Sequence, residues 1–413
     1  MLGLGSLFSR KENKVDIEPV VNLPASYYRS PELYALEQRA IFSKKWLFTT
    51  HESRFKEAGD YILYTVAGLN FFVIRDRQGS INAFQNVCRH RAFPVLGSKQ
   101  EGEELLTTET GKANILACKY HGWSYSMKGE LAKAPSFDNV PGFDPKQMGL
   151  WRLRLHIDEL GFIWVNMDMS EDALEWEDQF GDALKQQRLQ AVNFDDYQFD
   201  HSWGMEDCQY NWKVLLDNYN ECYHCGPAHP FINKTSDLTK YTVITGNNCI
   251  QHFNQAKPEF AQDPDVVPNF FFPYSSITIT PDYAYTMRVV PKGPTTTAMQ
   301  YDVYRHVNAK DDAFEETDKI FKQIEHEDKF LCTNVQRNIA AGTWNTGPLN
   351  PKHEAGVIYF QKLVKEALVE HWELEKAAGH EIHPARYQSC ASTDDAFCSE
   401  VSAGCGRSPE LQW

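Results

Sequence analysis

The sequence lacks several features, and each absence excludes a class of protein. No apolar run approaches the roughly 20 residues that a membrane-spanning helix needs, so we expect no membrane span. Clustered lysines and arginines are also missing, and 41 Lys and Arg against 56 Asp and Glu give a formal net charge of −15. Nucleic-acid phosphates demand clustered basic side chains, so we expect no nucleic-acid partner. An acidic chain is compatible with a cationic small molecule.

The beginning of the chain lacks the pattern of a secretory signal. The segment MLGLGSLFSRKENK has a short apolar part that charge soon interrupts. We therefore expect a cytoplasmic protein, with import into an organelle left open. The ten cysteines are spread along the chain, so we expect metal-binding or free-thiol roles for them and no disulfide framework.

Internal repeats and flavin or dinucleotide fingerprints are missing too, so electrons for any redox reaction must come from a separate protein. A chain of 413 residues exceeds the roughly 250–300 at which single cores stop growing, so we expect more than one core.

The distribution of apolar residues predicts an α+β protein. Residues 28–166 hold short alternating runs such as DYILYTV, NFFVIRD and GFIWVNM, which are typical of antiparallel strands in a small barrel or sandwich. Only residues 31–48 indicate a helix there. Two further β-rich runs, FFFPYSSITITPDYAYTMRVVP and TTTAMQYDVYRHV, precede amphipathic helices at about 312–341 and 357–377. An all-β domain followed by an α+β domain is the predicted order.

Two Cys–His pairs stand in the first region, Cys88-Arg-His90 and, after 27 further residues, Cys118-Lys-Tyr-His121. Two thiolates can hold one iron and two neutral imidazoles the other, which is the ligand set of a Rieske [2Fe–2S] centre. The same residues suit zinc, but zinc sites of this composition usually place both Cys in one half and both His in the other. Each pair also follows a β-type run, INAFQNV or ANILA, as a cluster clamped between two loops requires.

Together with GWSY after the second pair and GFIWVN at 161–166, these motifs resemble the Rieske domain of the non-haem iron oxygenases. The resemblance implies that Cys88 and Cys118 ligate one iron of the cluster while His90 and His121 ligate the other. One departure is Ala92, where the family usually has Gly, and another is a separation about ten residues longer than usual.

A second motif, NWKVLLDNYNECYHCGPAH at 211–229, offers two imidazoles, His224 and His229. Five residues along a straight helix turn a side chain by about 140°, so the two would not share a face. Gly226 and Pro227 are expected to end the helix and to let His229 fold back toward His224. Two histidines alone are weak evidence for a metal.

Helical periodicity suggests the third ligand in KIFKQIEHEDKFLCTNVQRNI. The predicted apolar stripe, whose missing member falls at Asp328, consists of Ile320, Ile324, Leu331, Val335 and Ile339. A buried carboxylate is costly unless it is paired or bound to metal, and two His with one carboxylate form the facial triad of a non-haem Fe(II) site. The alternative is a helix-surface acid beside Glu327, in which case Glu325 or Glu327 becomes the candidate ligand.

The second motif likewise resembles the catalytic domain of the same family, and its ECYH form resembles the branch that acts on quaternary ammonium compounds. The resemblance covers about residues 28–380 and implies His224, His229 and Asp328 as ligands of a mononuclear Fe(II). It implies Glu221 as the acid that hydrogen-bonds an iron-ligating His and connects this iron with the Rieske cluster of a neighbouring subunit, in a homotrimer.

The resemblance also implies the domain order and the partners. We expect an N-terminal extension at 1–27, a Rieske domain at 28–170, a catalytic domain at 171–384 and a tail at 385–413. The catalytic domain is expected to be helix-grip-like, an antiparallel sheet with helices. Electrons are expected from a ferredoxin or from a flavin and iron–sulfur reductase, with O₂ as co-substrate. Three basic residues beside the cluster ligands are either a docking patch for an acidic ferredoxin or ordinary loop charge: Arg89, Arg91 and Lys119.

Aromatic residues suggest the substrate class, because aromatic faces attract a trimethylammonium group. The candidates are Trp203, Tyr210, Phe270, Phe271, Phe272, Tyr274, Tyr283 and Tyr285. With the acidic charge and the ECYH form, they make choline the leading substrate, hydroxylated to betaine aldehyde through its hydrate. Carnitine cleavage and glycine betaine demethylation are close alternatives. An aromatic-ring dioxygenase α subunit and a pure electron carrier are the rival classes.

Overall fold

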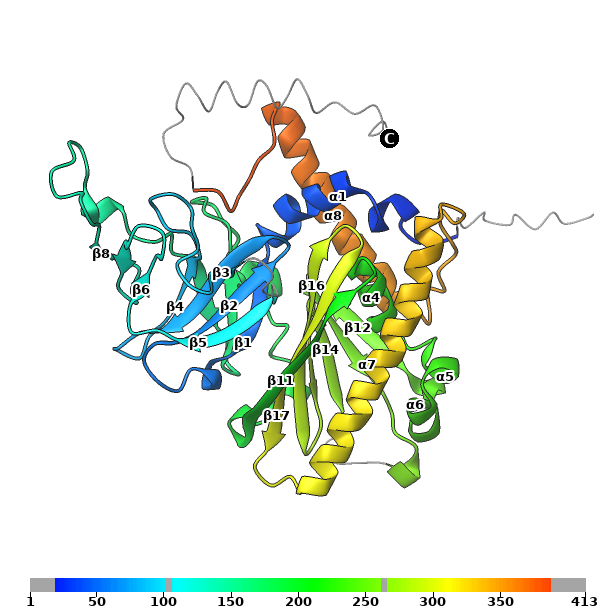
Figure 1. Cartoon of the computed structure of the whole chain (residues 1–413). Helices are drawn as coiled ribbons and strands as arrows, with labels where there is room; N and C mark the ends of the chain where they lie inside the picture. The colour runs from blue at the N-terminus through cyan, green and yellow to red at the C-terminus, as the bar shows by residue number, and fades with distance from the viewer. Residues whose placement is uncertain (1–18, 101–105, 261–265, 388–413) are drawn as a thin grey trace, which may run out of the picture.

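The computed structural model describes residues 19–100, 106–260 and 266–387 (Figure 1). The first long element is helix α1 (Pro31–Glu37), which begins where the Ser30 hydroxyl accepts a hydrogen bond from the Leu33 N–H, and it continues as a π-helical turn to Phe42. The predicted helix to residue 48 is wrong at its end. Strand β1 (Trp46–His51) begins there because this run is buried throughout its length, and aromatic and β-branched residues suit a buried strand.

The remainder of the N-terminal part is built from short antiparallel strands in three small sheets, as expected for an all-β domain. Their orders are β4–β3–β2–β5, β1–β10–β9 and β6–β7–β8. The strands are β2 (Asp60–Val66), β3 (Leu69–Arg75), β4 (Ile81–Gln85), β5 (Thr108–Lys112), β6 (Leu116–Ala117), β7 (Ser124–Tyr125), β8 (Leu131–Lys133), β9 (Arg154–Ile157) and β10 (Phe162–Asn166).

The C-terminal part contains one antiparallel sheet of seven strands in the order β11–β17–β16–β15–β14–β13–β12. Its strands are β11 (Tyr197–Cys208), β12 (Thr242–Gly246), β13 (Cys249–Phe253), β14 (Val267–Phe271), β15 (Ser275–Ile279), β16 (Tyr283–Gly293) and β17 (Thr296–His306). Consecutive strands from β12 to β17 pair with each other, so short turns connect most of the sheet.

Helices cover one face of this sheet, with α7 running along its length (Figure 1). The helices are α2 (Trp176–Phe180), α3 (Gln187–Gln190), α4 (Trp212–Tyr219), α5 (Cys225–Ala228), α6 (Pro230–Thr235), α7 (Asp311–Ala340) and α8 (Ala355–Ala378). The last two confirm the two amphipathic helices predicted from the sequence. Over the described ranges, no helix is long and apolar enough to cross a membrane.

A buried ionic cluster joins the two parts of the chain. The carboxylate of Asp302 on β17 accepts hydrogen bonds from the Thr50 hydroxyl (2.8 Å), Arg54 (2.9 Å) and Arg288 (3.0 Å). Burial opposes its ionisation, yet the two arginines hold the pKa of Asp302 well below its usual range. Around this cluster, one large apolar core extends from the first strands into the seven-stranded sheet, and a second, smaller core surrounds the Cys–His loops.

Candidate metal centres

Two loops carry the Cys–His pairs, each at the end of a short strand. β4 ends three residues before Cys88, and β6 directly precedes Cys118. Each loop is closed by its own backbone, because the Cys88 N–H donates to the Phe93 carbonyl (2.9 Å) and the Cys118 N–H donates to the Trp123 carbonyl (2.8 Å). The predicted position of the pairs at strand ends agrees with this geometry.

The Ala92 departure fits the same turn. The N–H groups of Ala92 and Gly122 donate to the carbonyls of Cys88 (3.0 Å) and Cys118 (3.1 Å), so the two residues occupy equivalent positions. Both have left-handed backbones, with φ of 58° at Ala92 and 72° at Gly122. Alanine costs roughly 1–2 kcal/mol there relative to an ordinary conformation, and the loop geometry is retained despite that cost.

The donor atoms of the two loops suit a cluster bound by two thiolates and two imidazoles. The side chains of Cys88 and Cys118 are buried, and the rings of His90 and His121 lie 4.5 Å apart between centroids. The ring of Trp123 stacks on His90 at 5.0 Å. Among the described residues, the buried Nδ1 of His90 has no hydrogen-bond partner. That nitrogen is therefore available as an iron ligand.

The basic residues near this site differ in what they contact. The guanidinium of Arg89 donates to the Gly149 carbonyl (2.6 Å) and lies 4.6 Å from the Trp151 ring centroid. Arg89 therefore holds the first loop against residues 147–151. Arg91 and Lys119 are exposed and remain available to a partner.

The second site begins where α4 ends. Asn211 caps the helix by accepting from the Lys213 N–H (2.9 Å), and the helix ends at Tyr219, where the Asn220 side chain donates to the Leu216 carbonyl. The sequence predicted that Gly226 and Pro227 end this helix. It ends earlier because the Asn220 side chain takes up a carbonyl of the last turn, and Gly226 and Pro227 instead form the single turn α5.

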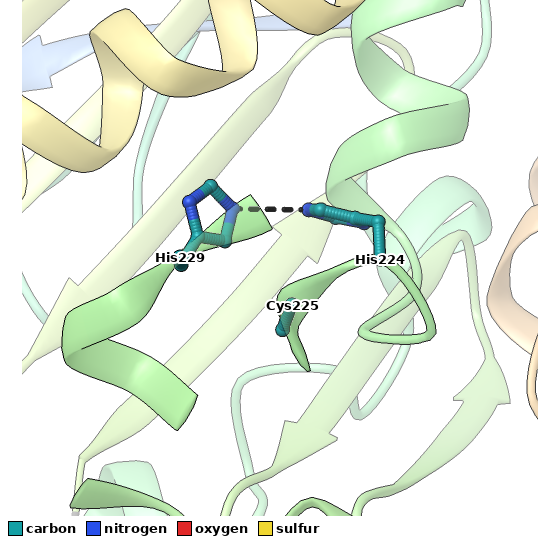
Figure 2. Close-up of side chains that lie close together, drawn as sticks. All are labelled: His224, Cys225 and His229. Carbon is teal, nitrogen blue, oxygen red and sulfur yellow. Dashed lines mark hydrogen bonds between the residues drawn. The ribbon is translucent and has the colours of Figure 1, made fainter. Parts of the chain in front are cut away.

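Three side chains converge on one point between α5 and α7. The Nε2 atoms of His224 and His229 are 3.1 Å apart (Figure 2), and an Asp328 Oδ1 lies 3.4 Å from the first and 3.3 Å from the second. Donor atoms bound about 2.1 Å from one metal at right angles are about 3 Å apart, as on one face of an octahedron. The geometry therefore suits a facial triad.

A carboxylate holds each of the two imidazoles. The Nδ1 of His224 lies 2.5 Å from Glu221 Oε1, and the Nδ1 of His229 lies 2.7 Å from Glu327 Oε2. Metal-bound histidines usually donate their other ring N–H to such an acceptor, which fixes the tautomer and the orientation of the ring. The Glu221 contact was expected, whereas Glu327 was considered only as an alternative ligand. Its position next to Asp328 was the available signal.

The electrostatics of this group favour a bound cation. Burial acts against a charged imidazole at His224, but the nearby carboxylates of Asp328 and Glu221 outweigh that effect and raise the pKa of His224 to about 9. The pKa of Asp328 is lowered despite its burial, because the nearby imidazoles of His224 and His229 stabilise its ionised form. A positive charge at the point where the three side chains meet is therefore stabilised.

The face of α7 that is buried differs from the predicted stripe. Its buried residues are Phe314, Glu325, Cys332, Gln336 and Ile339. Val335, a predicted stripe member, is 49% exposed. The helix is rotated because Glu325 and Gln336 find polar partners inside, a Tyr301 hydroxyl and the Tyr28 carbonyl. Asp328 nevertheless lies at the edge of the buried face.

A hollow of about 350 Å³ opens beside Glu221. Its lining combines carboxylates with apolar residues of α7, among them Asp217, Glu221, Glu354, Leu331, Val335 and Ile339. Two large aromatic residues are next in sequence to residues that line this hollow. They are Tyr223 and Phe330, and each is 67% exposed.

One cysteine pair departs from the expected free thiols. Cys222 and Cys225 form a disulfide, because their C-x-x-C spacing in the tight turn brings the Cα atoms to 5.0 Å. Cys225 lies beside the two histidines (Figure 2). Its sulfur is bonded to Cys222 and so is no thiolate ligand, since the thiolate is the form that binds metal.

Comparisons with known proteins agree with both sites. Residues 45–144 match the Rieske [2Fe-2S] domain family, and residues 194–268 and 268–370 match the ring hydroxylating alpha subunit (catalytic domain) family. A carnitine monooxygenase oxygenase subunit from Acinetobacter pittii is 30% identical over 364 residues, which are 83% of this chain and 94% of that protein. The chain belongs to the Rieske non-haem iron oxygenases. Its cofactors are a Rieske [2Fe–2S] cluster and a mononuclear iron, and it needs electrons from a partner reductase.

Further relatives of this Rieske oxygenase include the chloroplastic choline monooxygenase of Beta vulgaris, 30% identical over 88% of this chain and 80% of that protein. The solved structure of the quaternary ammonium Rieske monooxygenase CntA with L-carnitine has a TM-score of 0.72 at 28% identity, and covers 84% of this chain and 96% of that one. Naphthalene 1,2-dioxygenase from Rhodococcus sp., at 20% identity and a TM-score of 0.65 over 84% of this chain and 94% of that one, shares the fold. The predicted fold class is confirmed.

Glu327 gives a first test of the oxygenase's iron site. Replacing Glu327 by Gln is expected to weaken Fe(II) binding about 10–100-fold, because the His229 ring loses a charged acceptor that orients it. Anaerobic Fe(II) titration measures the affinity, and the visible spectrum of the Rieske cluster is expected to stay unchanged. The matched control is Glu316→Gln, which removes an exposed carboxylate from the same helix. Equal iron affinity in the two variants would contradict the role of Glu327.

Proposed function

We propose that this Rieske oxygenase inserts one atom of O₂ into a quaternary ammonium substrate, with choline as the leading substrate and betaine aldehyde, through its hydrate, as the product. The observation that carries the proposal is the convergence of His224, His229 and Asp328 in an acidic, aromatic-rich region. The names of the relatives, choline monooxygenase and carnitine monooxygenase, support the substrate class.

The proposed ligands follow the donor sets described above. Cys88 and Cys118 hold one iron of the cluster, and His90 and His121 hold the other. At the second site, His224, His229 and Asp328 hold the mononuclear iron. We also propose the domain boundaries 28–170 for the Rieske domain and 171–384 for the catalytic domain, with an extension at 1–27 and a tail at 385–413.

The side chains around the mononuclear iron keep its ligands in place. When bound, the iron supplies the O₂ chemistry, in which two electrons and two protons accompany the entry of one oxygen atom into the substrate while the other leaves as water. Glu221 and Glu327 hold the Nδ1 protons of the two histidines, so both Nε2 lone pairs face the same point. His229 is 1% exposed, and this burial keeps bulk water from its ring.

Electron transfer between subunits is supported by the arrangement in Figure 1. The Cys–His loops around β6 lie at one end of the molecule and α5 lies at the opposite side, so the two metal sites of one chain are far apart. The hollow beside Glu221 offers a place where a second chain can dock its Rieske domain. Its carboxylates complement the exposed Arg91 and Lys119 of that domain. We therefore propose a head-to-tail homotrimer, since heterologous contacts close into a ring when the rotation is threefold.

Charge also bears on the choice among quaternary amines. Three carboxylates lie next to the two histidines: Glu221, Glu327 and Asp328. A fourth, the buried Glu325, lies one helical turn before Asp328. This setting favours a cationic substrate without a carboxylate of its own, such as choline. Carnitine and glycine betaine carry a carboxylate, and carnitine is the second candidate because its monooxygenase is an equally similar relative.

A substrate panel tests the proposal. The iron-loaded protein, a surrogate ferredoxin and reductase, NADH and O₂ are incubated with choline, carnitine, γ-butyrobetaine, glycine betaine or naphthalene, and the products are identified by mass spectrometry. Choline is expected to give betaine aldehyde with O₂-dependent NADH consumption above the level without substrate. Turnover of carnitine alone would replace the leading substrate and keep the class. Turnover of naphthalene alone would contradict the class.

A further inference from the structure

Glu325 is a buried carboxylate that the proposed metal chemistry does not use. It lies on α7 three residues before Asp328, so one helical turn separates the two side chains on the same side of the helix. Its side chain is 5% exposed. Burial, together with the nearby Asp328, raises the pKa of Glu325 to about 8. The ionised form is therefore costly unless a positive charge lies close by.

The partners of Glu325 are hydroxyl groups. The Tyr301 hydroxyl donates to Oε2 at 2.6 Å, and the Tyr285 hydroxyl lies 3.5 Å from Oε1. Throughout the described part of the chain, no Lys, Arg or His side chain forms an ion pair with this carboxylate. Both oxygens thus have a donor, and the nearby His229 imidazole, which favours the ionised carboxylate, forms no ion pair with it.

The sheet opposite Glu325 presents aromatic rings and hydroxyls on one face. Directly paired residues share a face, so the pairs Thr278–Tyr285, Ser276–Met287 and Met287–Tyr301 place these side chains together. The hydroxyls of Ser276, Thr278 and Tyr219 are buried without a hydrogen-bond partner in the described structure. The ring of Trp203 stacks on Tyr301 at 4.1 Å between centroids.

Several predicted aromatic residues lie elsewhere. Phe271 packs against Trp164 and Phe180, and the Tyr274 hydroxyl donates to the Phe48 carbonyl, so both belong to the core between the domains. The aromatic residues near Glu325 are therefore a smaller set than the sequence suggested, and Tyr301 was not among the predicted ones.

We propose that Glu325 is the specificity-determining residue for a cationic head group. Its carboxylate and the rings of Tyr285 and Tyr301 contact that head group of the substrate. This assignment rests on the proposed function and deepens it. A trimethylammonium group has no N–H to donate and spreads its charge over its methyl groups, so it needs a nearby negative charge and aromatic faces. The carboxylate of Glu325 supplies the negative charge, and the rings of Tyr285 and Tyr301 supply the aromatic faces.

Equilibrium dialysis of the anaerobic, iron-loaded protein tests the assignment by binding alone. The two probes are radiolabelled choline and its carbon isostere, in which a tert-butyl group replaces trimethylammonium. Glu325→Gln is expected to weaken choline binding about tenfold or more and to leave the isostere nearly unchanged, because the variant keeps the shape and removes the charge. The matched control is Glu316→Gln on the exposed side of α7, which is expected to bind both probes like the wild type.

Different results overturn different claims. Equal choline affinity in the wild type and Glu325→Gln, or an equal loss for both probes, would overturn the assignment of Glu325 and leave the proposed function standing. Failure of the wild type to bind choline, carnitine, γ-butyrobetaine or glycine betaine would overturn the proposed function and this assignment with it.

If Glu325→Gln does not fold, as judged from its Rieske spectrum and iron content, Tyr301→Phe carries the test. This variant keeps the ring and removes the hydroxyl that stabilises the ionised carboxylate. A reduced preference for choline over the isostere is expected, and an unchanged preference would overturn the assignment.

Discussion

Asp328→Ala is expected to remove the mononuclear iron and to lower turnover about a thousandfold or more, while the Rieske spectrum stays intact. The oxygen of Asp328 lies 3.4 and 3.3 Å from the two histidine nitrogens, so its loss opens one side of the triad. A metal contributes several kcal/mol to the stabilisation of a reaction's transition state, which corresponds to roughly this factor. Iron analysis is expected to fall from about three to about two per chain, since the cluster holds two irons.

Two further variants serve as controls for the effect of Asp328→Ala. Asp312→Ala removes an exposed carboxylate from the same helix and is expected to retain all of the iron. Cys88→Ala is expected to show the reverse pattern, with loss of the Rieske visible and EPR signals. Full iron and activity in Asp328→Ala would contradict the triad, and Glu325 or Glu327 would then become the candidate ligand.

Glu221→Gln is expected to keep the Rieske cluster, the proposed trimer and, in excess Fe(II), the mononuclear iron, and to lower turnover about a hundredfold. The carboxylate of Glu221 holds the His224 ring and lines the hollow that we propose for the neighbouring Rieske domain. Removing its charge changes both contacts. Steady-state turnover with the preferred substrate measures the effect, alongside iron content and sedimentation for the assembly. Glu370→Gln, on the exposed side of α8, is the control.

Mixing subunits shows whether Glu221 acts between chains. Cys88→Ala and Asp328→Ala chains are each expected to be inactive alone. Co-assembled, they are expected to recover part of the activity, because an intact cluster of one chain then faces an intact iron site of the next. No recovery in a verified mixed trimer would indicate transfer within one chain and would contradict the proposed route.

Local patterns in the sequence predicted most of what positions the sites. Strand-like runs before Cys88 and Cys118 placed the Cys–His pairs at strand ends, and helical periodicity drew attention to Asp328. The rotation of α7 could not be predicted in the same way, because it depends on which polar groups of other elements meet Glu325 and Gln336 inside the protein.

The same limit applies to partners that are distant in the sequence. The role of Glu327 depends on the contact of α7 with His229, which lies 98 residues earlier. The end of α4 depends on one side-chain hydrogen bond of Asn220. In the sequence, Gly226 and Pro227 are the stronger signals for the end of a helix. Such contacts arise only when the tertiary structure brings the elements together.

A single-turnover experiment shows whether this oxygenase hydroxylates a quaternary amine, and it needs no reductase. The iron-loaded protein is reduced chemically without oxygen, the reductant is removed, and choline with O₂ is added while the product and the EPR signal of the reduced cluster are followed. Up to about one product molecule per chain is expected, formed as the reduced-cluster signal disappears. Loss of that signal without product from choline, carnitine, γ-butyrobetaine or glycine betaine would contradict a monooxygenase of quaternary ammonium compounds.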